Sequence, residues 1–535
     1  MMLERDRQRT QWDTAMKAIL ICKRRHVLLA ALLGTALSLS TSTTSAAAER
    51  DGRPNILFIY TDDQSHRTVS CYPEAYDWVQ TPNIDRLAAR GVRFTHAYVG
   101  TWCMPSRATL LTGLHPYGIE SMRMEGKYPG SVYDPNQCRF WPHVFRQQGY
   151  VTAQIGKWHT GTDTGFGRDW DYQVVWNRPA HPENAPHYYE DQLLTFNGTE
   201  TRLVKGYTTD NYTNWAVDFI GGKHRDPDKP WYLWLCYGAV HGPYTPAARH
   251  QNAYAQSRVP IPVDIYPPRP GKPAYMQQVE FWVRNQAGRP VRNVERPALE
   301  ERKSLNEWVR QYHQGVLAID EGVGKLLAAL EASGQLEQTL VVFTSDQGFA
   351  WGQHGFCTKL APYDANLRAP FVASMPGTLP AGVVCETPIG GADLVPTFFR
   401  FAGIDLPWAM HGNDLTELFK APGIDWPHAV LLAMTGASYG SDTDKVPTGP
   451  KLIRAGIPWW VSFRQGRYKY IRTLIEGEME ELYEVREDPE ELNNLALDEA
   501  HSSRLTDFRT ATVAELRRTG AKMADHLPSV QGAAP

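Results

Sequence analysis

Short, continuous apolar runs predict the core strands of this chain. The clearest are Ile56–Tyr60, Trp231–Leu235 and Leu340–Phe343, which no charged residue interrupts. A strand that is buried on both faces of a parallel sheet shows this pattern, because neither face meets solvent. We therefore predict that the three runs lie inside the sheet of an α/β fold.

Helical periodicity is strongest over Ser304–Ser333. Apolar residues recur there at spacings of three and four from Leu305 to Leu330, and Gly334 ends the pattern. We predict a helix that packs one face on the core. The preceding segment, residues 258–297, is rich in proline and basic residues and has weak periodicity, so we predict a long surface excursion there.

The pattern changes after Phe419. The runs Trp459–Phe463, Tyr468–Arg472 and Glu481–Val485 are short, and the turn residues Gln465-Gly466 separate the first two. Short strands that are joined by tight turns are typical of antiparallel sheets. We therefore predict a main domain over residues 52–420 and a smaller antiparallel-sheet subdomain over residues 421–535.

The amino terminus has the order of a secretory signal. Basic residues Lys23–Arg25 precede the apolar stretch Val27–Leu39, and small residues follow up to Ser45–Ala48. This order predicts a signal peptide and leader over residues 1–48, with cleavage near Ala47 or Ala48. The apolar stretch is short for a membrane span, and an uncleaved anchor is the alternative. We expect a secreted or periplasmic protein.

Composition narrows the classes of partner. The 535 residues carry a formal net charge of -3 and are 42% hydrophobic. This composition supports a sizeable core and gives no general attraction to nucleic acid or to an anionic membrane. The seven cysteines are too few and too scattered for a disulfide scaffold in a chain of this length. We predict no nucleic-acid partner and no stable membrane span.

Oxygen-bearing side chains follow two of the predicted strands. Asp62 and Asp63 come after the first run, and Asp346 and Gln347 come after the third. In an open α/β sheet the carboxyl ends of the strands line the crevice in which ligands bind, so these side chains are expected to converge. An all-oxygen shell suits a hard divalent ion, calcium above all. Alternatively, each pair caps a strand or a helix.

A cysteine precedes an arginine by four residues at a predicted helix start. Cys103 and Arg107 lie in the string Cys-Met-Pro-Ser-Arg-Ala-Thr-Leu-Leu-Thr-Gly. A helix N-terminus together with an arginine forms an anion site, so a nucleophile at this point could face an anionic ester. A buried cysteine beside a helix cap is the alternative.

The same string resembles the modification signature of the type I sulfatases, the formylglycine-dependent branch of the alkaline phosphatase superfamily. Gly149–His159 is similar to the second signature of that family, and Arg53–Asp63 and Ser345–Gly348 with Lys359 are similar to its metal segments. The resemblance extends from about Pro54 to Tyr483. It implies an alkaline-phosphatase-like fold, in which a large mixed sheet is flanked by helices and a smaller C-terminal antiparallel-sheet subdomain follows.

The resemblance also implies a nucleophile and a metal site. A formylglycine-generating maturation enzyme would convert Cys103 to formylglycine, also called 3-oxoalanine. The hydrated aldehyde would bind one Ca²⁺ per chain and offer a hydroxyl to sulfur. The implied protein ligands of the calcium ion are Asp62, Asp63, Asp346 and Gln347, together with modified Cys103.

Five further residues receive roles from the resemblance. Arg107 would hold the formylglycine and the sulfate, and Lys157 and Lys359 would neutralise sulfate oxygens. His241 would lie by the leaving oxygen, and His159 would help to restore the aldehyde. Three carboxylates, one Ca²⁺ and three cationic side chains leave a net charge of about +2, which suits an anionic sulfate ester.

Substrate recognition follows less directly from the sequence. Aromatic rings can stack on sugars and cationic groups can meet further anionic groups, so we expect a sulfated carbohydrate substrate. No role is assigned to the possible recognition residues His66, Arg67, Trp102, Arg123, Trp176, Arg178, His187 and Arg368, the last five of which we place in loops. Two other functions are compatible with the motifs: a phosphodiesterase or phosphonate monoester hydrolase with the same nucleophile, and a secreted carbohydrate-binding pseudoenzyme in which Cys103 stays unmodified.

Overall fold

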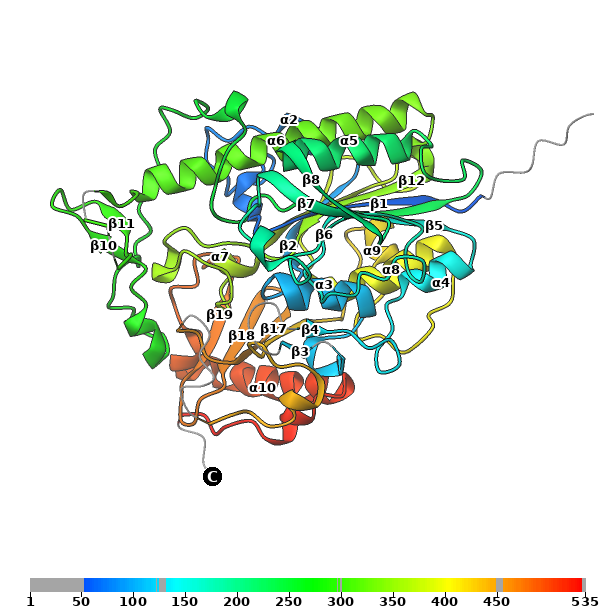
Figure 1. The fold of residues 1–535 in the computed structure, drawn as a ribbon. Coiled ribbons are helices and arrows are strands. Elements are labelled where there is room, and N and C mark those ends of the chain that lie inside the picture. Colours follow the sequence, from blue (N-terminus) through cyan, green and yellow to red (C-terminus); the bar gives the residue numbers. More distant parts are fainter. Residues whose placement is uncertain are drawn as a thin grey trace, which may run out of the picture. The chain divides into compact units, whose positions relative to one another are not determined.

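The computed structural model describes residues 52–121, 123–124, 131–295, 297–298, 301–448 and 456–531. The predicted signal peptide and leader, residues 1–48, lie outside the described residues. In the described part of the chain, a mixed sheet has helices on both faces (Figure 1). The predicted α/β fold is therefore confirmed.

The large sheet has 11 strands in the order β14-β2-β13-β12-β1-β9-β5-β6-β7-β8, and β15 pairs with β2. Its strands are β1 (Asn55–Thr61), β2 (Val92–Tyr98), β5 (Val151–Lys157), β6 (Tyr172–Trp176), β7 (Glu190–Phe196), β8 (Glu200–Tyr207), β9 (Trp231–Cys236), β12 (Thr339–Ser345), β13 (Ala369–Ser374), β14 (Val383–Cys385) and β15 (Ile389–Gly390). The predicted runs are the strands β1, β9 and β12, and all three are fully buried.

The centre of the sheet is parallel. Strands β12, β1, β9, β5 and β6 run in one direction, whereas β13 and β7 pair antiparallel on either side of them. In the register of β1 with β12, Thr61 lies opposite Ser345. The residues that follow these two strands therefore emerge at the same edge of the sheet.

Helices cover both faces of this sheet. The described helices are α2 (Pro82–Ala89), α3 (Cys103–Thr112), α4 (Pro142–Gln147), α5 (Thr208–Ile220), α6 (Leu305–Ala332), α7 (Asp364–Leu367), α8 (Leu394–Ala402), α9 (Thr416–Lys420) and α10 (Ser502–Arg518), the last of which packs against the smaller C-terminal sheet instead. Helices α2, α5 and α6 lie on one face and α3 and α8 on the other (Figure 1). Leu57 and Ile59 belong to the same apolar cluster as residues of α2, α5 and α6, and Phe58 and Tyr60 belong to the cluster that contains residues of α3 and α8. The alternating side chains of β1 thus join two separate apolar cores.

The long predicted helix is α6. Ser304 is its N-cap and accepts a hydrogen bond from the backbone of Glu307, whose carboxylate accepts one from the backbone of Ser304 in return. This capping box satisfies backbone donors that the first turn of a helix leaves unpaired. The excursion before it contains the short hairpin of β10 (Trp282–Arg284) and β11 (Pro290–Arg292).

A second, four-stranded antiparallel sheet follows in the order β16-β17-β18-β19. Its strands are β16 (Val430–Met434), β17 (Trp460–Gln465), β18 (Tyr468–Thr473) and β19 (Glu480–Glu484). The three strands expected after Phe419 are confirmed. Strand β16 was not predicted, although its five apolar residues carry the same signal as the other buried strands. The boundary between residues 420 and 421 stays a prediction.

The described cysteines are free thiols, in agreement with the expected lack of a disulfide scaffold. None of the helices in the described part of the chain has the length and apolar character that crossing a bilayer requires.

The remaining described strands, β3 (Arg123–Met124) and β4 (Ser131–Val132), form a short antiparallel pair. Arg123 therefore lies in a strand and not in a loop.

Close packing of β5 against β9 makes Gly156 sensitive to substitution. Its φ is 104°, and an added Cβ would lie 1.9 Å from the carbonyl oxygen of Cys236 on β9. We expect Gly156→Ala to lower the free energy of unfolding by about 2 to 4 kcal/mol, measured by urea denaturation. Gly222 is a matched control, because its φ is 98° and nothing lies within 4 Å of an added Cβ. Gly222→Ala should cost about 1 kcal/mol, and equal losses in the two variants would refute the role of the close contact.

Candidate active site

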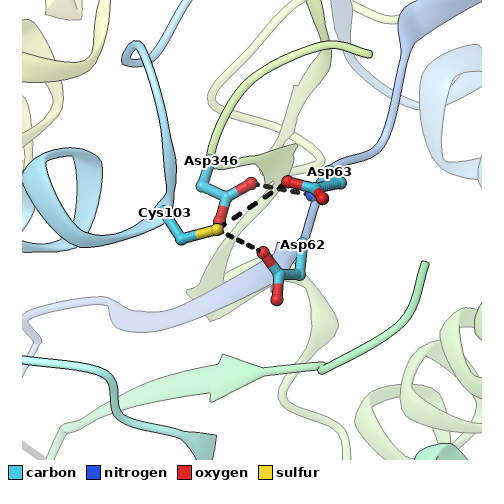
Figure 2. A group of neighbouring side chains, drawn as sticks. All are labelled: Asp62, Asp63, Cys103 and Asp346. Carbon is cyan, nitrogen blue, oxygen red and sulfur yellow. Dashed lines mark hydrogen bonds between the residues drawn. The ribbon is translucent and has the colours of Figure 1, made fainter. Parts of the chain in front are cut away.

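Three carboxylates and a cysteine meet at one edge of the large sheet. Asp62 and Asp63 follow β1, Asp346 follows β12, and Cys103 is the first residue of α3. All four are buried, and one potential ligand atom from each lies within 4.8 Å of the others (Figure 2). The sequence prediction that the two acid segments converge is confirmed.

Backbone contacts fix the two aspartates that follow β1. The Asp62 amide donates to the Ala239 carbonyl at 3.0 Å, and the Val240 amide donates to the Asp62 carbonyl at 2.8 Å. The Asp63 amide donates to Oδ1 of Asp346 at 2.8 Å. Asp63 has a φ of 60°, an uncommon conformation for a residue with a side chain. The loop after β9 and the end of β12 together hold this turn.

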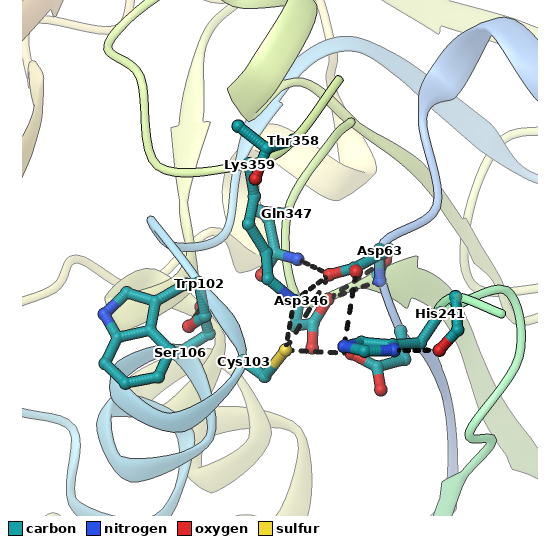
Figure 3. A network of polar contacts seen from close by, with 12 residues as sticks. Asp63, Trp102, Cys103, Ser106, His241, Asp346, Gln347, Thr358 and Lys359 are labelled. Carbon is teal, nitrogen blue, oxygen red and sulfur yellow. Dashed lines mark hydrogen bonds and ion pairs between the residues drawn. The ribbon is translucent and has the colours of Figure 1, made fainter. Parts of the chain in front are cut away.

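Cys103 points into the carboxylates. Its Sγ lies 3.0 Å from Oδ1 of Asp62, and the Lys359 Nζ donates to Sγ at 2.9 Å and to Oδ1 of Asp63 at 2.6 Å (Figure 3). Burial raises the pKa of the Cys103 thiol well above its usual value, and the negative charge of Asp62 raises it further. Because the thiolate is the reactive form, the unmodified side chain is a weak nucleophile.

Two further cations, both fully buried, lie beside the carboxylates. Lys157, the last residue of β5, forms an ion pair with Oδ2 of Asp62. Arg107, one turn into α3, donates to the Lys157 carbonyl at 3.0 Å and lies 3.6 Å from Oδ2 of Asp346. The cationic groups Lys157, Arg107 and Lys359 thus surround the three acids.

The acids titrate differently because their neighbours differ. Burial raises the pKa of Asp62, but Lys157 and the other cationic groups around it together outweigh burial and hold this pKa well below its usual value. Burial and the negative charge of Asp62 raise the pKa of Asp346 well above its usual value. Burial also raises the pKa of Asp63. A divalent cation among the three would relieve both the repulsion and the cost of burial.

The donor atoms fit calcium. Oδ2 of Asp346 and Oε1 of Gln347 are buried and have no hydrogen-bond partner. The Gln347 Nε2 donates to Oδ1 of Asp63, and the two ends of an amide exchange by rotation, so its oxygen can face the same space. Carboxylate and amide oxygens without a histidine match the preference of a hard cation. Asp62, Asp63, Asp346 and Gln347 could therefore hold Ca²⁺.

The two predicted histidines occupy different positions. His241 lies beside Asp63, with 3.7 Å between Nε2 and Oδ2, and 27% of its side chain is exposed. Burial and the charge of Lys359 lower the pKa of His241 well below its usual value. His159 follows β5 and is buried, and burial and the charge of Lys157 lower its pKa well below its usual value. His241 is therefore partly accessible to solvent, whereas His159 is buried.

Several functional neighbours escaped the sequence analysis. The Tyr312 hydroxyl donates to the Asp63 carbonyl and accepts from the Ser65 amide at 3.0 Å. The Arg107 guanidinium lies 5.1 Å from the ring centre of Tyr60. Both tyrosines belong to apolar patterns that predict core positions. A hydroxyl on a buried face requires a polar partner, and for Tyr312 this requirement is the signal that the sequence offered. The Tyr60 hydroxyl has no hydrogen-bond partner within the described part of the chain, so its ring contact with Arg107 had no such signal.

Some of the possible recognition residues have structural partners. Arg368 donates to Glu74 at 2.9 Å, and Arg67 donates to Glu490 at 2.6 Å. Trp176 is the last residue of β6, so its assignment to a loop was wrong. Trp102 is buried as the N-cap of α3.

Comparisons with known proteins agree with this geometry. A family model described as Sulfatase matches residues 54–404. The N-acetylglucosamine-6-O-sulfatase of Bacteroides thetaiotaomicron is 29% identical, covering 86% of this chain and 85% of its own length. The arylsulfatase of Clostridium perfringens is 26% identical, covering 87% of this chain and 94% of its own length.

Solved structures share the fold. One, in complex with its substrate D-glucosamine-2-N,6-O-disulfate, has a TM-score of 0.72 at 25% identity, covering 87% of this chain and 98% of that one. The phosphonate monoester hydrolase of Agrobacterium radiobacter has a TM-score of 0.64 at 20% identity, covering 87% of this chain and 96% of that one. The family model spans well over half of the chain, and the sequence had identified the same family. The chain belongs to the sulfatase family.

Proposed function

We propose that this chain removes sulfate from a sulfated carbohydrate, using a formylglycine that is derived from Cys103 and one bound calcium ion. The observation that carries the proposal is the position of Cys103. Its Sγ lies 3.0 Å from Asp62 and 2.9 Å from Lys359, between the acids that could hold the ion and a cation that could hold sulfate.

The raised pKa of the Cys103 thiol supports the modification. A buried neutral thiol attacks poorly, whereas a hydrated aldehyde offers two hydroxyl groups from the same position. One hydroxyl can attack sulfur, which forms an S–O bond to the protein as the bond to the leaving alcohol breaks. The other can then lose its proton, so that the aldehyde re-forms and sulfate leaves.

The charges around Cys103 suit an anionic substrate. When bound, calcium would supply positive charge opposite the sulfate oxygens. Lys157 and Lys359 reach the carboxylates from two sides, and either ammonium can turn toward a sulfate oxygen. His241 is partly exposed, and in its protonated form its Nε2 can donate a proton to the leaving oxygen. We propose that His159 accepts the proton that the second hydroxyl loses.

The names of the relatives suggest the substrate class. A glucosamine sulfatase is among the most similar relatives, and a disulfated glucosamine is the substrate in a structure with the same fold. We propose a sulfated amino sugar within a poly- or oligosaccharide as the substrate. The predicted leader supports a secreted or periplasmic location, and the Cys103 string supports a formylglycine-generating enzyme as maturation partner.

Sulfate release tests the reaction. We expect protein coexpressed with a formylglycine-generating enzyme to release inorganic sulfate from sulfated oligosaccharides, measured by ion chromatography. Cys103→Ala should lose at least about a thousandfold in rate, because the nucleophile is gone. Cys71→Ala is the matched control, since this thiol lies beside Asp85 and outside the cluster, and it should keep the wild-type rate.

The same assay separates the rival functions. Cleavage of phosphonate monoesters without any sulfate release would favour the hydrolase whose structure shares the fold. Saccharide binding without release of either anion, by protein that carries the aldehyde, would favour the pseudoenzyme. Either result would refute the proposed sulfatase reaction.

Calcium dependence of stability tests the metal site separately. We expect a thousandfold excess of Ca²⁺ over its Kd to stabilise the wild type by about 4 kcal/mol, measured by calorimetry. Asp346→Asn keeps an acceptor for the Asp63 amide but removes one charged ligand, so most of this gain should disappear. Asp218→Asn changes an exposed acid and should respond like the wild type.

Without calcium, Asp346→Asn should gain stability relative to the wild type. The pKa of Asp346 is raised in the folded state, so its ionisation costs stability as pH rises above the unfolded value of about 4. The stability of metal-free Asp346→Asn relative to metal-free wild type should therefore increase as the pH rises from the unfolded-state pKa of Asp346 to its higher folded-state pKa. A variant that is destabilised equally with and without calcium would contradict the metal site.

A further inference from the structure

Tyr188 contacts three cationic or catalytic side chains at once. Its ring is parallel to the ring of His241, with 4.1 Å between the centres and 4° between the planes. The Lys157 Nζ lies 5.2 Å from the centre of the same ring, and the Arg178 guanidinium lies 4.8 Å from it.

The Tyr188 ring is itself firmly held. It is 3% exposed and packs edge-on against Trp176, with 4.6 Å between the ring centres. Arg178 donates to its hydroxyl, and the Thr208 hydroxyl donates to its backbone carbonyl at 2.8 Å. Partners from the end of β6 and the start of α5 therefore fix the plane of the ring.

Among the described residues, the ring of His241 makes one hydrogen bond. Its Nδ1 donates to the Gly242 carbonyl at 2.7 Å, and a carbonyl only accepts, so Nδ1 carries a proton. The Nε2 lies 3.7 Å from Oδ2 of Asp63, beyond the length of a hydrogen bond. One short hydrogen bond leaves the ring free to rotate about that contact, whereas a parallel neighbour restricts the plane.

We propose that Tyr188 is a positioning residue, whose ring holds the imidazole of His241 so that Nε2 faces the leaving oxygen of the substrate. This inference rests on the proposed function and extends it. Tyr188 covers one face of the His241 ring, and 27% of the His241 side chain stays exposed for the substrate. The Tyr188 ring therefore contacts both His241 and the Lys157 ammonium.

The consequence depends on the leaving group. A good leaving group such as nitrophenolate departs without a proton donor, whereas the alkoxide of a sugar needs one. Nε2 of the neutral His241 ring carries no proton, so the ring must first be protonated, as a bound anionic sulfate favours, before it can donate to that alkoxide. Loss of His241 orientation should therefore slow release from sugar esters much more than release from nitrophenyl sulfate. General loss of packing around the site would slow both substrates alike.

The test compares Tyr188→Leu, Tyr188→Phe and His241→Ala in the modified, calcium-loaded enzyme, with kcat measured on nitrophenyl sulfate and on a sulfated glucosamine. We expect Tyr188→Leu to lower kcat by about tenfold to a hundredfold on the sugar and by less than about threefold on the aryl ester. Tyr188→Phe keeps the ring and should stay within about threefold of wild type on both. His241→Ala should show the same selectivity as Tyr188→Leu, with a larger loss.

Three results would overturn the proposal. Equal losses on both substrates in Tyr188→Leu would indicate a structural role only. A loss in Tyr188→Phe as large as in Tyr188→Leu would place the effect on the hydroxyl and not on the ring. His241→Ala without selectivity would leave nothing to position, although sulfate release by the wild type would still support the proposed function. Tyr188→Met, which fills the space with a flexible chain, replaces Tyr188→Leu if that variant does not fold.

Discussion

The parallel pairing of β1 with β12 is the interaction on which the site depends. It places Thr61 opposite Ser345, so that Asp62, Asp63 and Asp346 follow at one edge of the sheet. Burial of three carboxylates in one place is unfavourable unless cations surround them. Lys157, Arg107 and Lys359 meet that need in the protein itself, and each arrives from a different element.

The C-terminal sheet supports the loop that carries Lys359. Lys469 of β18 donates to Asp364 at 2.7 Å and to Glu491 at 2.8 Å, and all three side chains are buried. Asp364 begins α7, five residues beyond Lys359. A buried charge whose partner is removed is strongly destabilising. The smaller sheet therefore contributes to the site through an ionic contact, although it supplies none of the predicted ligands.

The sequence revealed the parts of the structure that repeat a simple pattern. Continuous apolar runs located β1, β9 and β12, and the acids after them converge as parallel topology requires. The roles of Tyr188 and Tyr312 could not be predicted, because each depends on a contact between residues that are distant in the chain. The stack of Tyr188 on His241 forms only when the segment before β7 packs on the loop after β9, and no sequence periodicity predicts that contact.

Peptide mass spectrometry of Cys103, combined with the rate of sulfate release, tests the central claim most directly. Preparations with different degrees of maturation should contain different fractions of chains in which the CH₂SH group of Cys103 is replaced by an aldehyde. The proposed nucleophile predicts that the rate of sulfate release per chain rises in proportion to that fraction and vanishes when it is zero. Full activity in a preparation whose Cys103 is entirely unmodified would contradict it.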